Sequence, residues 1–192
     1  MGRPRKFDET YVLAAAMDAF WRQGYEATST RDLADCTGVG QSSLHNAFGD
    51  KHQLYLRALR HYYDTATAEQ TALLQRPGPV KDRIRELIVR AIEADLDDPE
   101  APGCFAINAS VERASSDPAV KKEVLRHFAT VQDSLQEAVA RGQSTGEITG
   151  TYDARSLAGQ VLSTYYGLRV LARVRDDRQS LLNVVDAMLV AL

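Results

Sequence analysis

Residues 28–51 constrain the fold of this chain most, because they predict two short helices joined by a tight turn. Ser29 is a typical N-cap, since its hydroxyl can accept hydrogen bonds from the free N–H groups of the first helix. Gly38 supplies the left-handed backbone that ends this helix, and Val39 fills the angle between the two helices. The second helix is expected at residues 41–48, which completes a helix-turn-helix.

The second helix has one apolar face and one polar face. Leu44 and Phe48 are four residues apart and therefore share the face that we expect to be buried. The other positions carry mostly small or amide side chains, which suit a helix that lies in a major groove and contacts base edges. The open face consists of Gln41, Ser42, Ser43, His45, Asn46 and Ala47.

The charge of the chain neither supports nor excludes DNA binding. The formal net charge is −3, but residues 1–60 contain eight Lys/Arg and seven Asp/Glu, which gives +1 and leaves −4 for the rest. The positive charge at a DNA contact must therefore come from basic residues placed close to that contact. Lys51 directly follows the second helix, and Arg3, Arg5 and Lys6 form a basic N-terminal arm. We favour an arm that contacts DNA, and the alternative is an unstructured, solubilising tail.

Several other classes of protein are disfavoured. No run of about 18 apolar residues is present, and the N-terminus lacks the apolar core of a signal peptide, so we expect a cytoplasmic protein without a membrane span. Cys36 and Cys104 are too few for a disulfide framework or a zinc site, and we expect Cys36 to pack inward. The chain contains no HExxH, GxSxG, P-loop or paired-Gly nucleotide motif, so we expect no catalysis, metal or cofactor.

Helical periodicity continues through most of the chain, and no segment shows sustained period-two alternation. The prediction is an all-α fold of about nine helices. The helices outside the helix-turn-helix are expected near residues 9–23, 51–74, 80–96, 105–114, 118–142, 154–174 and 177–191.

Several short motifs fall at the spacing of a known family. They are the first helix ending in AFWRQGY, the TS before the second helix, the GV turn, and FGDK before a long helix. With them the chain closely resembles the N-terminal domain of the tetracycline-repressor (TetR) family of bacterial transcriptional regulators. The segment GCFAINASVE at 103–112 is similar to one found in a subset of that family that includes redox-sensing regulators.

The resemblance implies a homodimer with two DNA-binding heads and a C-terminal domain that binds a small effector and releases operator DNA. We assign residues 1–51 to the DNA-binding domain and 52–192 to the effector-binding and dimerisation domain. His45 and Asn46 depart from the family, which usually has Tyr at the first position and often an aromatic residue or His at the second; Asn46 is suited to bidentate contact with adenine. The positions at which the family contacts DNA correspond to Thr30, Gln41, Ser42, Ser43, His45 and Asn46, with Lys51 at a phosphate contact.

The two C-terminal helices, at 153–174 and 177–191, predict self-association. Gly159, Ser163 and Gly167 form a smooth strip that lets another helix approach closely. The last helix is apolar over much of its surface. We expect a two-fold four-helix bundle that holds two reading heads apart, and the alternative is that both helices complete the core of a monomer.

Aromatic and polar residues within otherwise apolar helices suggest an effector cavity, although each one by itself is more often a core residue, and we expect fewer than about half of them to touch ligand. Cys104 follows Pro102 and Gly103 at a helix N-terminus, where the helix dipole favours thiolate chemistry. It is either a redox or electrophile sensor or a small buried core residue. The predicted ligand-binding residues are Tyr62, Tyr63, Cys104, Phe105, Asn108, Glu112, His127, Tyr165 and Tyr166.

These observations predict a TetR-like regulator, best described as a repressor that a small-molecule effector releases from operator DNA. Two alternatives are kept. One is a repressor that senses oxidants or electrophiles through Cys104. The other is a constitutive architectural DNA-binding protein, against which the large C-terminal domain argues.

Overall fold

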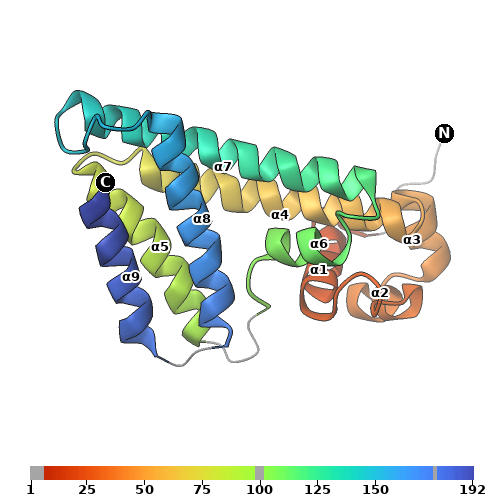
Figure 1. Cartoon of the computed structure of the whole chain (residues 1–192). Coiled ribbons are helices and arrows are strands. Elements are labelled where there is room, and N and C mark those ends of the chain that lie inside the picture. The colour runs from red at the N-terminus through yellow and green to blue at the C-terminus, as the bar shows by residue number, and fades with distance from the viewer. Residues whose placement is uncertain (1–6, 98–101, 175–176) are drawn as a thin grey trace. The chain divides into compact units, whose positions relative to one another are not determined.

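A computed structural model describes residues 7–97, 102–174 and 177–192, and within these ranges the chain forms nine helices and no strand (Figure 1). The all-α prediction is confirmed. Arg3, Arg5 and Lys6, the predicted basic arm, lie outside the described residues. The helices are α1 (Glu9–Gln23), α2 (Thr30–Thr37), α3 (Gln41–Phe48), α4 (Lys51–Leu74), α5 (Val80–Asp97), α6 (Phe105–Glu112), α7 (Pro118–Ser144), α8 (Ala154–Ala172) and α9 (Arg178–Ala191).

The helices belong to two compact units. The first unit comprises the described residues up to Thr65 together with Phe105–Val124, and the second comprises Ala66–Cys104 and Leu125–Leu192. Helices α4 and α7 therefore each contribute to both units. This grouping by contacts differs from the functional boundary expected between residues 51 and 52, which stays a prediction.

Hydrogen bonds at helix ends fix the start of the first unit. The Asp8 carboxylate accepts from the Thr10 amide at 2.8 Å and so caps α1. Ser29 and Asp32 form a capping box at the start of α2, with reciprocal hydrogen bonds of 2.8 and 3.1 Å. Gly38 ends α2 at φ 68° and ψ 15°, which confirms the predicted left-handed turn. The buried side chains of this unit include Val12, Ala16, Phe20, Leu33, Leu44, Phe48, Leu54 and Leu59.

One packing prediction is wrong, because Cys36 is exposed rather than turned inward. The buried positions of α2 are Leu33 and Thr37, which are four residues apart on one face. Thr37 can face the interior because its hydroxyl donates to the Leu33 carbonyl at 2.6 Å. Cys36 is displaced from that face by one residue, and its Sγ lies at the edge, 3.5 Å from the same carbonyl.

In the second unit, α5, α8 and α9 lie side by side (Figure 1) and share an apolar core with parts of α4 and α7. Glu147, in the loop before α8, accepts hydrogen bonds from the amides of Val80 and Lys81 at 2.9 and 2.7 Å. It thereby caps the first turn of α5 from a distant part of the chain. No helix within the described ranges is long and apolar enough to cross a membrane.

Candidate nucleic-acid interface

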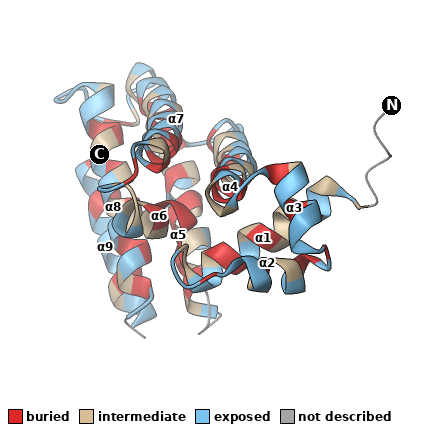
Figure 2. Ribbon diagram, turned by 90° about the vertical axis from the view of Figure 1, so that its right-hand side faces the viewer, coloured by how far each residue is buried: buried red, intermediate tan, exposed pale blue. Residues whose placement is uncertain are grey.

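Helix α3 turns an apolar face inward and a polar face outward (Figure 2). Leu44 and Phe48 are buried, with exposed fractions of 6% and 4%, as their spacing predicts. Ala47 is half-buried. The exposed positions of the helix are Gln41, Ser42, Ser43, His45 and Asn46.

Contacts at the C-terminal end of α3 hold the helix in place. The Phe48 ring stacks on Phe7 with the ring centroids 6.3 Å apart. The guanidinium of Arg57, on α4, lies 4.6 Å from the centroid of the Phe48 ring. Arg57 also donates to the Ala47 carbonyl at 3.3 Å and pairs with Glu9 on α1. Sequence reasoning missed Arg57, because it lies within α4 and no local signal indicates its contact with the end of α3.

A hollow of about 520 Å³ lies beside α3 and brings the predicted DNA-binding positions together. Every predicted DNA-binding residue within the described ranges lines this hollow except Ser43, which is exposed on the same helix. Hydroxyl, amide, imidazole and ammonium groups meet here, and these groups bind phosphate oxygens and base edges. The hollow is lined by Thr30, Leu33, Gln41, Ser42, Leu44, His45, Asn46, Gly49, Asp50 and Lys51.

Lys51 has a neighbour that the sequence did not indicate. Its Nζ lies 4.3 Å from the ring centroid of Tyr25, in the loop between α1 and α2. Asp50, the residue before it, caps α4 by accepting from the Gln53 amide at 2.8 Å. Lys51 is the first residue of α4, and its ammonium group lies beside the exposed face of α3.

The structure divides the nine predicted ligand-binding residues between the two units. Five belong to the first unit, where Tyr62 lies edge-on to Phe105 at 5.6 Å and to Trp21 at 5.0 Å. Trp21 is a member of this aromatic cluster that sequence reasoning missed. Glu112 lies outside the cluster and accepts hydrogen bonds from two backbone amides of the α1–α2 loop. The five residues are Tyr62, Tyr63, Phe105, Asn108 and Glu112.

The other four predicted residues belong to the second unit. His127 is 2% exposed, and its ring nitrogens lie 3.1 Å from the Thr67 hydroxyl and 3.2 Å from the Tyr166 hydroxyl. Burial lowers the pKa of His127 to about 4, so the imidazole is neutral at pH 7. The Tyr165 hydroxyl accepts from Gln70 at 3.1 Å. The four residues are Cys104, His127, Tyr165 and Tyr166.

The predicted smooth strip on α8 lies at the surface of the second unit. Ser163 and Gly167 are exposed and Gly159 is half-buried. A Cβ atom added at Gly167 would meet no atom within 4 Å. On α9, Val184 and Val190 are 45% and 85% exposed, which leaves apolar side chains uncovered on the C-terminal helix.

A capped helix-turn-helix with a polar outer face, joined to an all-helical unit with uncovered apolar side chains, defines a helix-turn-helix transcriptional regulator. Residues 12–58 match the model of the bacterial regulatory proteins of the tetR family, and residues 80–188 match the tetracyclin repressor-like C-terminal domain. The chain belongs to the tetR family.

Whole-chain relatives agree with this assignment. The chain is 31% identical to the uncharacterized HTH-type transcriptional regulator YezE of Bacillus subtilis (strain 168), over 100% of both chains. It is 27% identical to the HTH-type transcriptional repressor ComR of Escherichia coli (strain K12), over 98% of this chain and 90% of ComR. A cysteine mutant of the TetR family regulator CifR, solved with 26-bp double-strand operator DNA, superimposes with a TM-score of 0.84 at 30% identity, covering 99% of both chains.

Proposed function

We propose that this chain is a cytoplasmic repressor that binds double-stranded operator DNA as a homodimer and releases it when a small molecule binds the second unit. The observation that carries the proposal is the exposed polar face of α3, held rigidly by the buried Leu44 and Phe48. The activity is one of binding, without a catalytic step.

In this proposal the exposed face of α3 enters the major groove. Asn46 contacts adenine through its amide, and Gln41 contacts a second base or a phosphate. Lys51 and Thr30 contact phosphates and fix the register of the helix. His45, where the family usually has Tyr, donates a ring N–H to a phosphate.

The homodimer forms through α8 and α9, whose exposed strip and uncovered valines support a four-helix interface. Two-fold symmetry presents two copies of α3 to half-sites separated by about 34–36 Å or a multiple of this distance. A two-fold symmetric operator is therefore part of the proposal.

The effector binds among the polar and aromatic residues of the second unit, where the neutral His127, Tyr165 and Tyr166 place polar groups beside an apolar core. It acts by binding more tightly to a state with low DNA affinity than to the DNA-bound state. A response to oxidants through Cys104 is the alternative signal.

The test is a fluorescence-anisotropy titration of the protein with duplex DNA from upstream of its own gene and with random duplex. We expect tighter binding to the upstream fragment, and Asn46→Ala should remove most of that preference. A wild-type protein that binds both duplexes equally would contradict the proposal. A panel of small molecules and oxidants added to the complex then tests release.

A further inference from the structure

We propose that Glu112 and Tyr25 are positioning residues for the phosphate contact of Lys51, so that α6 and the start of α7 are a working part of the DNA-binding head. The proposal rests on the proposed function. It concerns only the first unit, which contains the helix-turn-helix and Phe105–Val124 together.

The first step is a hydrogen-bonded contact between Glu112 and the α1–α2 loop. The Glu112 carboxylate accepts from the Tyr25 and Glu26 amides, each at 3.0 Å. These amides follow Gly24, which ends α1 at φ 84°. A Cβ at Gly24 would lie 3.1 Å from the carboxylate, so the side chain fits closely against the bare backbone. A carboxylate from α6 therefore satisfies two amides at the end of α1.

Arg113 and Asp117 add to this contact. The Arg113 guanidinium pairs with Glu26 at 2.5 Å and with Asp117 at 3.3 Å. Asp117 in turn lies 2.8 Å from His52 on the first turn of α4. Burial alone would raise the pKa of Asp117, but the Val120 amide, His52 and Arg113 hold it below its ordinary value. The turn between α6 and α7 thus contacts both the loop and the start of α4.

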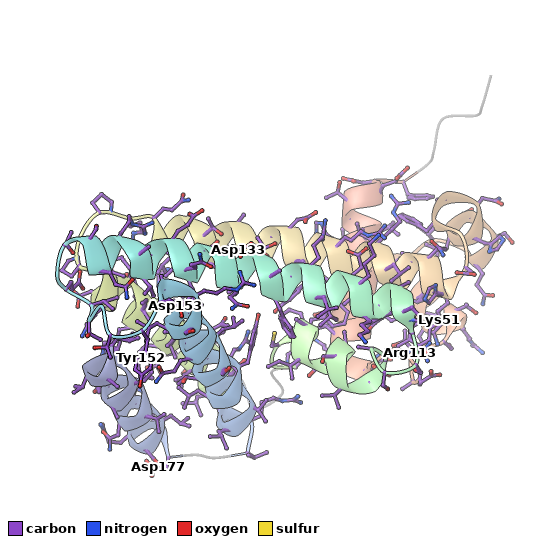
Figure 3. All side chains as sticks on the ribbon, turned by 45° about the horizontal axis from the view of Figure 1, so that its top comes forward. Lys51, Arg113, Asp133, Tyr152, Asp153 and Asp177 are labelled. Carbon is purple, nitrogen blue, oxygen red and sulfur yellow. The ribbon has the colours of Figure 1, made fainter. Side chains whose placement is uncertain are left out.

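The second step leads from the loop to the DNA-binding lysine. The Tyr25 ring has Lys51 Nζ at 4.3 Å and the Arg113 guanidinium at 4.6 Å from its centroid. Figure 3 labels Lys51 and Arg113, which lie near one another in this unit. An ammonium beside an aromatic face loses rotamer freedom, and the attraction favours that position about two- to fivefold at an exposed site. The ring thereby keeps Lys51 near the hollow beside α3.

The experiment measures the affinity of the full-length protein for random duplex DNA as a function of salt, and then repeats it with the upstream fragment. Removing a negative charge should strengthen DNA binding by simple electrostatics, and Glu137→Ala, an exposed carboxylate on α7, is the matched control. We expect Glu112→Ala to weaken binding about fivefold instead. Tyr25→Leu should do the same, whereas Tyr25→Phe, which keeps the ring, should bind like wild type.

A double-mutant cycle separates positioning from general loss of structure. Lys51→Ala should lower the salt slope by about 1, Glu112→Ala should lower it partly, and the double variant should match Lys51→Ala. Amide exchange at Tyr25 and Glu26 should quicken in Glu112→Ala while α3 keeps its protection. Additive effects in the cycle, or an unchanged slope in Glu112→Ala, would overturn this inference alone. Wild type without preference for the upstream fragment would overturn the proposed function and this inference with it.

Discussion

Arg169 on α8 donates two hydrogen bonds to Asp95 on α5, at 2.7 and 2.8 Å, and both side chains are buried. A bidentate pair of this kind satisfies each charge only while the other is present. It therefore fixes the relative register of two helices in the core of the second unit.

Breaking this pair should destabilise the protein strongly. Arg169→Met leaves Asp95 charged and buried, and we expect the free energy of unfolding to fall by about 3–5 kcal/mol in urea titrations at pH 7. The double variant Asp95→Leu/Arg169→Met removes both charges and should recover most of that loss. If the single variant were as stable as wild type, the pair would have no structural role.

Loss of a base contact and loss of a phosphate contact should have different effects on DNA binding. Asn46→Ala should cost about 1–3 kcal/mol on the operator and almost nothing on random duplex, because it removes a contact to a base edge. Lys51→Ala should weaken binding to both duplexes similarly and lower the salt slope by about 1. Anisotropy titrations at several salt concentrations measure both quantities. Equal losses on the two duplexes for Asn46→Ala would refute its reading role.

The neutral, buried His127 makes stability depend on pH. Its folded pKa of about 4 lies below the ordinary value of 6.5, so the unfolded chain binds a proton first as the pH falls. Its contribution is complete above pH 6.5 and is lost progressively between pH 6.5 and 4, by roughly 3 kcal/mol in total. Urea unfolding of wild type and His127→Gln across this range measures the difference. Parallel pH profiles would show that His127 does not carry the effect.

Gly167 offers a test of the dimer that leaves the protomer intact. A leucine there has open space within the protomer, but in the proposed dimer it would separate α8 from its partner helix. We expect Gly167→Leu to sediment as a monomer at micromolar concentration with an unchanged helical content. Gly150→Leu, in an open loop, is the matched control. A dimeric Gly167→Leu protein would place the interface elsewhere.

The two cysteines should differ in reactivity. Cys36 is exposed, although partial burial raises its pKa, whereas Cys104 is only 3% exposed. An aromatic disulfide reagent should therefore modify one thiol of the native protein, and the second only after unfolding. Cys36→Ser should abolish the native reaction. Rapid reaction of Cys104 in that variant would instead favour the redox-sensing alternative.

Local signals along the chain were sufficient to predict the helices. Asp8, Ser29, Asp153 and Asp177 each cap a helix, and these caps are local signals because a cap acts on amides two or three residues away. The bounds of α3 follow from the Gly residues at both ends and the spacing of Leu44 and Phe48. Cys36 was misplaced, and Ala47 is half-buried rather than on the open face, because a short helix leaves the edge of its buried face poorly defined.

The same local signals do not predict long-range contacts. Glu112 was expected among the ligand-binding residues, yet its carboxylate bonds to amides 86 and 87 residues away. Arg57 lies outside every motif and Tyr25 ends the AFWRQGY motif, but neither position predicts a partner, and each acquires its role only when α4 packs beside α1 and α3. The sequence also placed all nine predicted effector residues in one domain, whereas five of them belong to the compact unit of the head.

The membership of Phe105–Val124 in the first unit bears on protein engineering. A chimera that exchanges DNA specificity by a single crossover after α3 or within α4 would bring a foreign loop against the native Glu112 and Arg113. Three crossovers, after Thr65, before Phe105 and after Val124, transplant the reading module with its own support. Hybrids made with one crossover should retain the response to the effector and bind the new operator weakly.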